Sequence, residues 1–267
     1  MQLYDLHCHT KLSLCASRNS EMSEFVRIAD EDGLAAIGFS DHAWDAGIGR
    51  PIDFYVPQTY EKLLARVKPE SKSVKVFLGA EGEFAQGLLG VRRSTMQKLD
   101  YIIIPHSHTH MKNFVLPEGC GEARPHGRYL FNSFVALMHH PNADLIFGIA
   151  HPFWPCGKSF EDKQEILSNI TDDEFEYCGN LAYKNNIYLE INASSIISMP
   201  IEKAATSEYA RFIRNAKKGG ARFFLGSDNH CQTEHDKNSL FKMPDYMEEF
   251  GLCEDDIKSA LHQILHG

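Results

Sequence analysis

Two histidines near the start of the chain have the spacing of a metal-binding pair. His7 and His9 directly follow a short apolar run, and residues i and i+2 of an extended segment point to the same side. Both imidazoles are therefore expected on one side of the end of a strand. Neutral imidazole is the commonest metal ligand in proteins. With fourteen histidines in the chain, one such pair can arise by chance, so its meaning depends on the residues at the ends of the other strands.

Polar side chains that can bind metals or transfer protons also come after most of the later apolar runs. They are the pair Asp41 and His42, Glu81, His106 and His108, His151, and Asp228 with His230. Each one alone could be a turn, cap or solvated residue. Their joint occurrence is harder to explain that way, because buried carboxylates and imidazoles must be paired or metal-bound. The pattern favours one metal centre formed by several strand ends.

Seven apolar runs are predicted as strands, and helical segments separate most of them. The predicted strands are 2–6, 34–39, 74–78, 101–104, 145–149, 187–191 and 222–225. The predicted helices are 21–32, 58–67, 92–98, 128–140, 202–218, 239–250 and 254–265. The segment 161–186 is predicted to be mostly helical, and 111–126 to be a loop. Asn19 or Ser20 is expected to cap the first helix, and Gly33 to end it.

The repeated strand-then-helix order predicts an α/β fold with a parallel sheet. The strands are continuous apolar runs, as expected where both faces are covered. An open doubly wound sheet is the alternative, but no Gly-rich phosphate loop comes after the first strand. A barrel is the simplest way to bring so many strand ends to one mouth, at the carboxyl face where barrel active sites lie. We therefore predict a single (β/α)7 barrel domain over residues 1–267.

Composition narrows the classes of partner. The hydrophobic fraction of 43% and the charged fraction of 24% are those of an ordinary globular protein. A net charge of −9 argues against a nucleic-acid-binding surface but permits a small anionic substrate held by metal. Seven cysteines without a C-x-x-C spacing indicate a reducing compartment and no disulfide framework. Neither a signal peptide nor a membrane span is expected, so a cytoplasmic location is expected.

Taken together, the motifs resemble those of the PHP (polymerase and histidinol phosphatase) domain family. They are His7-x-His9-Thr10, Ser40-Asp41-His42, Gly79-x-Glu81, His108, His151-Pro152 and Ser227-Asp228-x-His230, in the order of the family. The resemblance covers nearly the whole chain. It implies a distorted (β/α)7 barrel that holds two or three divalent metal ions, namely zinc, manganese or iron.

The resemblance also implies a set of ligands for each ion. The first metal would take His7, His9, Glu81 and Asp228. Glu81 would bridge to a second metal, which is also held by His108 and His151. The third would take His42, His230 and the residue at position 15. Asp228 and His42 are in addition the candidates for catalytic roles.

Position 15 is where this chain departs from the family, which usually has Asp or His there. Cys15 would make the third site a good zinc site and a poorer site for manganese. A weak or empty third site is one alternative. The other is that Cys15 is a small buried side chain that packs behind the first strand, as free cysteines often do.

Metals a few ångströms apart activate water and stabilise an in-line phosphoryl displacement, and the resembling family contains phosphatases and phosphoesterases. We therefore expect a metal-dependent phosphoesterase, similar to histidinol phosphatase, whose partner is a small phosphorylated metabolite. The alternatives are a metal-dependent C–N bond hydrolase of amidohydrolase type and an inactive metal-binding regulatory domain.

Candidate substrate contacts are Lys11 and His106, then His110, Arg50, Arg124 and Arg128. The alternative for Lys11 and the three arginines is a solvated surface charge, which is favoured. The alternative for His106 and His110 is to hold the metal ligands from behind. His106 and His108 are two residues apart, so on a strand both would point to the same side. His108 is preferred as the ligand because of its position in the motif.

Overall fold

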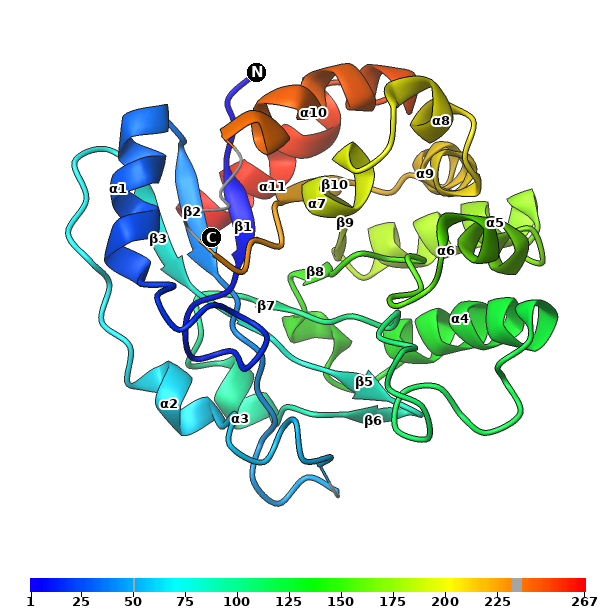
Figure 1. The fold of residues 1–267 in the computed structure, drawn as a ribbon, viewed down its shortest axis with the longest axis horizontal. Coiled ribbons are helices and arrows are strands. Elements are labelled where there is room, and N and C mark those ends of the chain that lie inside the picture. The colour runs from blue at the N-terminus through cyan, green and yellow to red at the C-terminus, as the bar shows by residue number, and fades with distance from the viewer. Residues whose placement is uncertain (50, 232–236) are drawn as a thin grey trace.

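The strands of the molecule lie at its centre and the helices lie around them (Figure 1). The computed structural model describes residues 1–49, 51–231 and 237–267. Arg50 lies outside the described residues. The strands are β1 (Asp5–Cys8), β2 (Ala36–Phe39), β3 (Lys75–Leu78), β4 (Ala80–Glu81), β5 (Phe84–Ala85), β6 (Leu88–Leu89), β7 (Ile102–Ile103), β8 (Gly148–Ile149), β9 (Tyr188–Asn192) and β10 (Phe223–Gly226).

Apart from the short antiparallel hairpin β5–β6, the described strands are paired in parallel, in two sheets. The first has the order β1-β2-β3 and the second the order β10-β9-β8-β7-β4. Every residue of β1, β2, β9 and β10 is buried, as expected for strands covered on both faces. The predicted α/β architecture with parallel strands is confirmed.

The chain links the two sheets at two places. At one, the chain leaves the first sheet at β3 and enters the second at β4, with Gly79 between them. A side chain at Gly79 would lie 2.5 Å from the ring of Tyr101, whose hydroxyl donates to the carbonyl of Leu6. At the other place, Cys8 forms an isolated parallel bridge with Asn229. The bridge between Cys8 and Asn229 brings β1 beside β10.

The helices are α1 (Met22–Asp32), α2 (Tyr60–Leu64), α3 (Arg93–Met96), α4 (Ala123–Met138), α5 (Phe160–Leu167), α6 (Asp172–Lys184), α7 (Ala193–Ile197), α8 (Ile201–Ala205), α9 (Glu208–Lys218), α10 (Lys237–Glu249) and α11 (Glu254–His266), with a 3-10 turn at Ala143–Leu145. In the described part of the chain, no helix is long and apolar enough to cross a membrane.

Several predicted boundaries are wrong because a cap interrupts the pattern. The segment 161–186 is mostly helical, as predicted, and it forms two helices, since Thr171 accepts a hydrogen bond from the backbone N–H of Glu174 and starts α6. The segment 202–218 divides in the same way at Ser207, which caps α9. α4 begins inside the predicted loop, and α7 and the hairpin β5–β6 were not predicted.

The ends of the first helix test the predicted capping signals directly. α1 starts after Glu21, which makes no side-chain cap hydrogen bond, so the predicted cap at Asn19 or Ser20 is wrong. Gly33 ends the helix with a φ of +72°, as predicted.

Candidate metal centre

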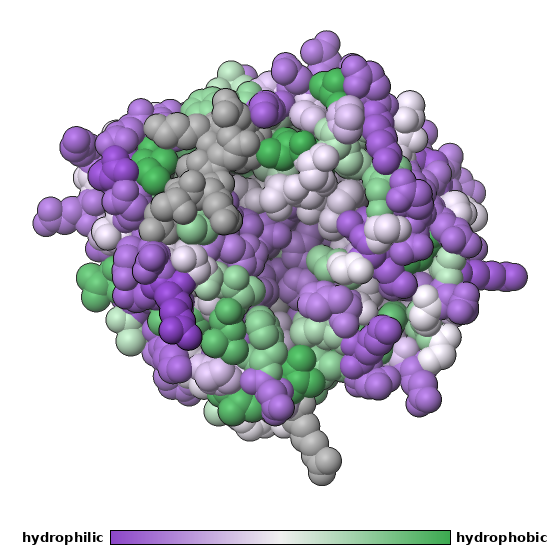
Figure 2. Space-filling view, in the orientation of Figure 1, coloured by the Kyte–Doolittle hydropathy of each residue, from purple (hydrophilic) through white to green (hydrophobic). Residues whose placement is uncertain are grey.

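The predicted ligands lie at, or just beyond, the carboxyl ends of the parallel strands and surround one cavity of about 410 Å³. Figure 2 shows a hollow near the middle of this face with a hydrophilic lining and hydrophobic surface along part of its rim. The cavity is lined by Cys15, His42, Ile52, Phe54, Glu81, His108, His110, Met111, His151, Cys156, Asp228 and His230. His7 and His9, which belong to the same cluster, are fully buried.

The first group of donors is formed by His7, His9, Glu81 and Asp228. The Nε2 atoms of His7 and His9 are 3.0 Å apart, and Glu81 Oε2 lies 3.5 Å from each. Asp228 Oδ1 lies 3.5 Å from His7 Nε2 and 3.3 Å from His9 Nε2. Two nitrogens and two carboxylate oxygens therefore meet at one point, which is a donor set that suits a divalent metal ion.

A second group shares Glu81 with the first. Glu81 Oε1 lies 3.0 Å from His151 Nε2 and 3.7 Å from His108 Nε2. The other oxygen of the same carboxylate, Oε2, faces His7 and His9. Glu81 is thus oriented as a carboxylate that bridges two metal ions would be.

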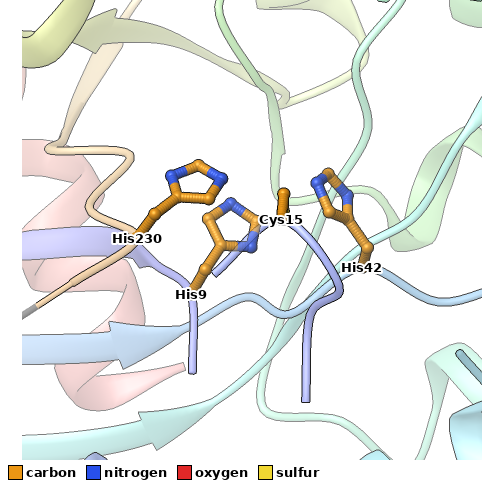
Figure 3. Close-up of side chains that lie close together, drawn as sticks. All are labelled: His9, Cys15, His42 and His230. Carbon is orange, nitrogen blue, oxygen red and sulfur yellow. The ribbon is translucent and has the colours of Figure 1, made fainter. Parts of the chain in front are cut away.

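A third group is formed by His9, Cys15, His42 and His230, whose ligand atoms all lie within 4.8 Å of one another. Figure 3 shows these four side chains gathered from three segments of the chain. Cys15 is exposed and lines the cavity. The alternative of a buried Cys15 packed behind the first strand is therefore wrong.

The ring nitrogen that faces away from the cavity has a partner in five of these histidines. The partners of the Nδ1 atoms are Glu190 for His7 (2.7 Å), Ser13 for His9 (3.1 Å), Glu83 for His108 (2.7 Å), Ser107 for His151 (2.7 Å) and the carbonyl of Asp228 for His230 (2.8 Å). A ring that donates from Nδ1 keeps a lone pair on Nε2, and metal-binding histidines are typically fixed in this way. The residues present therefore fit a metal centre.

Sequence reasoning did not find these partners. Two of them, Glu190 and Glu83, are carboxylates that are fully buried. Besides His7, Glu190 accepts the backbone N–H of His151 at 2.5 Å and so fixes two ligand segments. Its position in the middle of the apolar strand β9 was the available signal, since a charge there must be paired. Glu83 also accepts a hydrogen bond from the hydroxyl of Tyr55 at 2.9 Å.

Asp41 lies behind the cavity, where it organises the loop after β1. It accepts the backbone N–H of Thr10 at 2.6 Å and the hydroxyl of Ser13 at 2.9 Å. Arg66 donates to its other oxygen at 3.0 Å. Because Ser13 also contacts His9, Asp41 acts on the centre through Ser13.

Two of the candidate ligands adopt a backbone conformation that is uncommon for residues other than glycine. The φ angle is +29° at His151 and +58° at Asp228. Such strain persists only where the surroundings fix it, and it is concentrated at functional sites. The backbone N–H of Asp228 donates to the carbonyl of His7 at 2.7 Å, which ties the last strand end to the first.

Metal binding is expected to weaken as the pH falls. Burial favours the neutral form of His108, but the carboxylates of Glu83 and Glu81 outweigh it and raise its pKa. Burial is likewise outweighed at His7 by Glu190, Asp228 and Glu81, which raise the pKa of that ring. Without metal, both rings therefore stay protonated at pH values above the ordinary imidazole pKa of about 6.5. A metal ion that binds to them must displace these protons.

We expect the zinc affinity to fall by about tenfold per pH unit for each displaced proton. Competition with a chelator of known affinity at several pH values between about 6 and 8 measures this slope. An affinity that does not change over this range would contradict the assignment of these rings as ligands.

Most of the predicted substrate contacts do not line the cavity. Lys11 is exposed and pairs with Glu21 at 2.5 Å, outside the cavity lining. His106 is fully buried between Phe134 and Phe153, and its Nε2 accepts the backbone N–H of Phe153 at 3.1 Å. Burial lowers the pKa of His106 to about 3, so the ring is neutral. The structure gives neither residue a position against a substrate.

Among the other candidates, only His110 lines the cavity in the part of the chain that the structure describes. Arg128 pairs with Glu174 at 2.7 Å, and Arg124 is exposed. No described Lys or Arg contributes to the cavity lining.

A family model described as the PHP domain matches residues 5–194, which is most of the chain and includes the motifs from His7 to His151. The chain belongs to the PHP domain family. No curated protein matches the chain in sequence.

Two of the solved structures with a similar fold match over most of the chain. Histidinol phosphate phosphatase (HISK) from Lactococcus lactis subsp. lactis Il1403, in complex with zinc, L-histidinol and phosphate, superposes with a TM-score of 0.61 and 17% identity, covering 94% of this chain and 95% of that chain. The putative histidinol phosphatase hisK from Listeria monocytogenes gives a TM-score of 0.62 and 12% identity, covering 87% and 97%. At these identities the likeness concerns the fold.

Proposed function

We propose that this protein is a metal-dependent phosphoesterase that hydrolyses a small phosphomonoester, as a histidinol phosphatase does. The observation that carries the proposal is the position of Glu81, whose two oxygens face two separate groups of histidine Nε2 atoms. A pair of metal ions bridged in this way activates water and neutralises charge on a transferring phosphoryl group. The zinc, L-histidinol and phosphate bound by the Lactococcus protein support the same class of chemistry.

In this proposal the ligands are those that the family resemblance implies, and Asp228 and His42 have a second role. Asp228 lines the cavity, and the imidazoles of His7 and His9 outweigh the effect of burial and lower the pKa of its carboxyl. Its carboxylate would orient the attacking water. Burial favours neutral His42, but Glu81 outweighs it and raises the pKa of the ring. Where the third site holds no metal ion, His42 would therefore donate a proton to the leaving alcohol.

The lining of the cavity constrains the substrate. Because no Lys or Arg lines it in the described part of the chain, the bound metal ions would balance most of the phosphate charge. The organic part of a substrate would contact the apolar side chains of Ile52, Phe54 and Met111. A phosphomonoester of a small, partly apolar alcohol fits these surroundings best.

We further propose that the two sheets act as one distorted (β/α)7 barrel in a single domain over residues 1–267. The passage of the chain through Gly79 and the bridge between Cys8 and Asn229 support this closure. A barrel would bring all the candidate ligands to its carboxyl face.

Phosphate release from a panel of phosphorylated metabolites tests the function. The protein is stripped with a chelator and reconstituted with zinc, manganese or iron before each assay. We expect turnover of at least one phosphomonoester that depends on the added metal. Metal-loaded protein that cleaves amides but no phosphoester would favour a C–N hydrolase, and metal-loaded protein without turnover would favour a regulatory domain.

Replacing Cys15 tests the third metal site. Cys15→Ser is expected to lose one metal ion and keep the other two, because the first two donor groups do not use this residue. Cys15→Asp restores the ligand that the family usually has and should shift the preference toward harder ions such as manganese. Elemental analysis of the purified variants measures both effects. Unchanged zinc content in Cys15→Ser would end the assignment of Cys15 as a ligand.

A further inference from the structure

A second cysteine, Cys156, lies beside the donors of the second group. Its Sγ and the ligand nitrogens of His108 and His151 all lie within 4.8 Å of one another. The side chain lines the same cavity. The implied set of ligands does not include it, because the second metal is assigned there to Glu81, His108 and His151.

The loop after β8 is fixed so that this sulfur faces the two histidines. The backbone N–H of Cys156 donates to the carbonyl of Ser107 at 3.0 Å, and the hydroxyl of Ser107 contacts His151 Nδ1 at 2.7 Å. One residue therefore positions both the ring of His151 and the backbone of Cys156.

His106 and Phe153 hold the middle of the same loop. Phe153 is fully buried with a φ of +55°, and its N–H donates to His106 Nε2 at 3.1 Å. Of the two roles that the sequence left open for His106, substrate contact or support of the ligands from behind, this contact favours the second. The Nε2 atom of His106 accepts a hydrogen bond from the loop backbone between His151 and Cys156, and so helps to fix the spacing of these two residues.

We propose that Cys156 is a thiolate ligand of the second metal ion, so that this site consists of Glu81, His108, His151 and Cys156. The inference rests on the proposed metal centre. Two nitrogens, one oxygen and one sulfur form a donor set that suits zinc, and zinc can expand to five ligands, which would leave room for a water or a phosphate oxygen. Thiolate selects zinc over manganese, which prefers oxygen donors. With Cys15 in the third group, thiols would belong to two of the three sites, and both would prefer zinc to manganese.

Cobalt substitution tests this assignment without any measurement of activity. Chelator-stripped protein is loaded with Co²⁺ alone, and thiolate-to-cobalt charge-transfer absorption is recorded in the near ultraviolet. The wild type contains two candidate thiols, so the informative background is Cys15→Ala. We expect the absorption to persist in Cys15→Ala and to disappear in the double variant Cys15→Ala/Cys156→Ser. Cys120→Ala in the same background is the matched control, because Cys120 is also partly buried but does not belong to any described donor group.

A second measurement is the release of zinc to a chelator. Cys156→Ser is expected to release one zinc ion more readily by at least the roughly 10–100-fold that loss of an outer partner of a ligand costs, while its circular dichroism spectrum stays that of the wild type. Cys15→Ala protein that shows no charge-transfer absorption, although it binds cobalt, would overturn the proposal. These results are independent of phosphate release, so a failure of the proposed phosphoesterase activity would be recognised separately.

Discussion

Glu81→Gln is expected to weaken two metal sites at once. The substitution keeps the size of the side chain but removes its charge and one of its two acceptor oxygens. Because Oε2 faces His7 and His9 while Oε1 faces His108 and His151, neither group keeps its full set of donors. We expect bound metal to fall by about two ions per chain, and phosphate release to fall by more than the roughly 10–100-fold that outer partners of ligands typically cost.

Glu83→Gln is the matched control for this prediction. Glu83 lies two residues further on, is equally buried, and holds His108 Nδ1 at 2.7 Å. Its loss should weaken only the second group, by about 10–100-fold in metal affinity, and leave the first group loaded. Elemental analysis and metal titration of both variants give the comparison. Equal losses of metal from Glu81→Gln and Glu83→Gln would show that Glu81 is not the bridge.

The sequence was sufficient to predict the convergence of the candidate ligands. Parallel strands present their carboxyl ends on one side, so a polar residue after an apolar run indicates where its side chain lies. Glu81 and Asp228 each have an oxygen 3.5 Å from His7 Nε2, although the three residues are far apart in the chain. Strand order and helix order are local patterns, which is why they were also predictable.

The partners behind the ligands were not predictable, because they depend on contacts between distant segments. Glu190 is 183 residues from His7, and Ser107 is 44 residues from His151. Strand parity also failed where the backbone is irregular. β7 contains only two residues, so the alternation does not extend to His106 and His108. His106 faces Phe153, whereas His108 faces the cavity.

Gly226→Ala is expected to disrupt the first group of donors from behind. A Cβ atom at this position would overlap Glu190 Oε1 and lie 2.6 Å from the Cβ of His7. Neither neighbour can move away easily, because both are fully buried and joined by a hydrogen bond. Glu190 also accepts a hydrogen bond from the backbone N–H of His151. Overpacking of this kind typically costs about 1–3 kcal/mol. The displaced His7 ring should in addition lower metal occupancy of the first group.

The free energy of unfolding and the metal content of Gly226→Ala, each measured with and without added zinc, separate these two effects. Overpacking destabilises the protein in both conditions, whereas a lost metal site reduces the extra stability that zinc provides. Gly121→Ala is the control, because a Cβ there meets nothing within 4 Å, and its effect should stay within about 0.5 kcal/mol. A Gly226→Ala protein with full metal content and wild-type stability would show that Glu190 does not hold His7 rigidly. The support of the first ligand would then have to come from β1 alone.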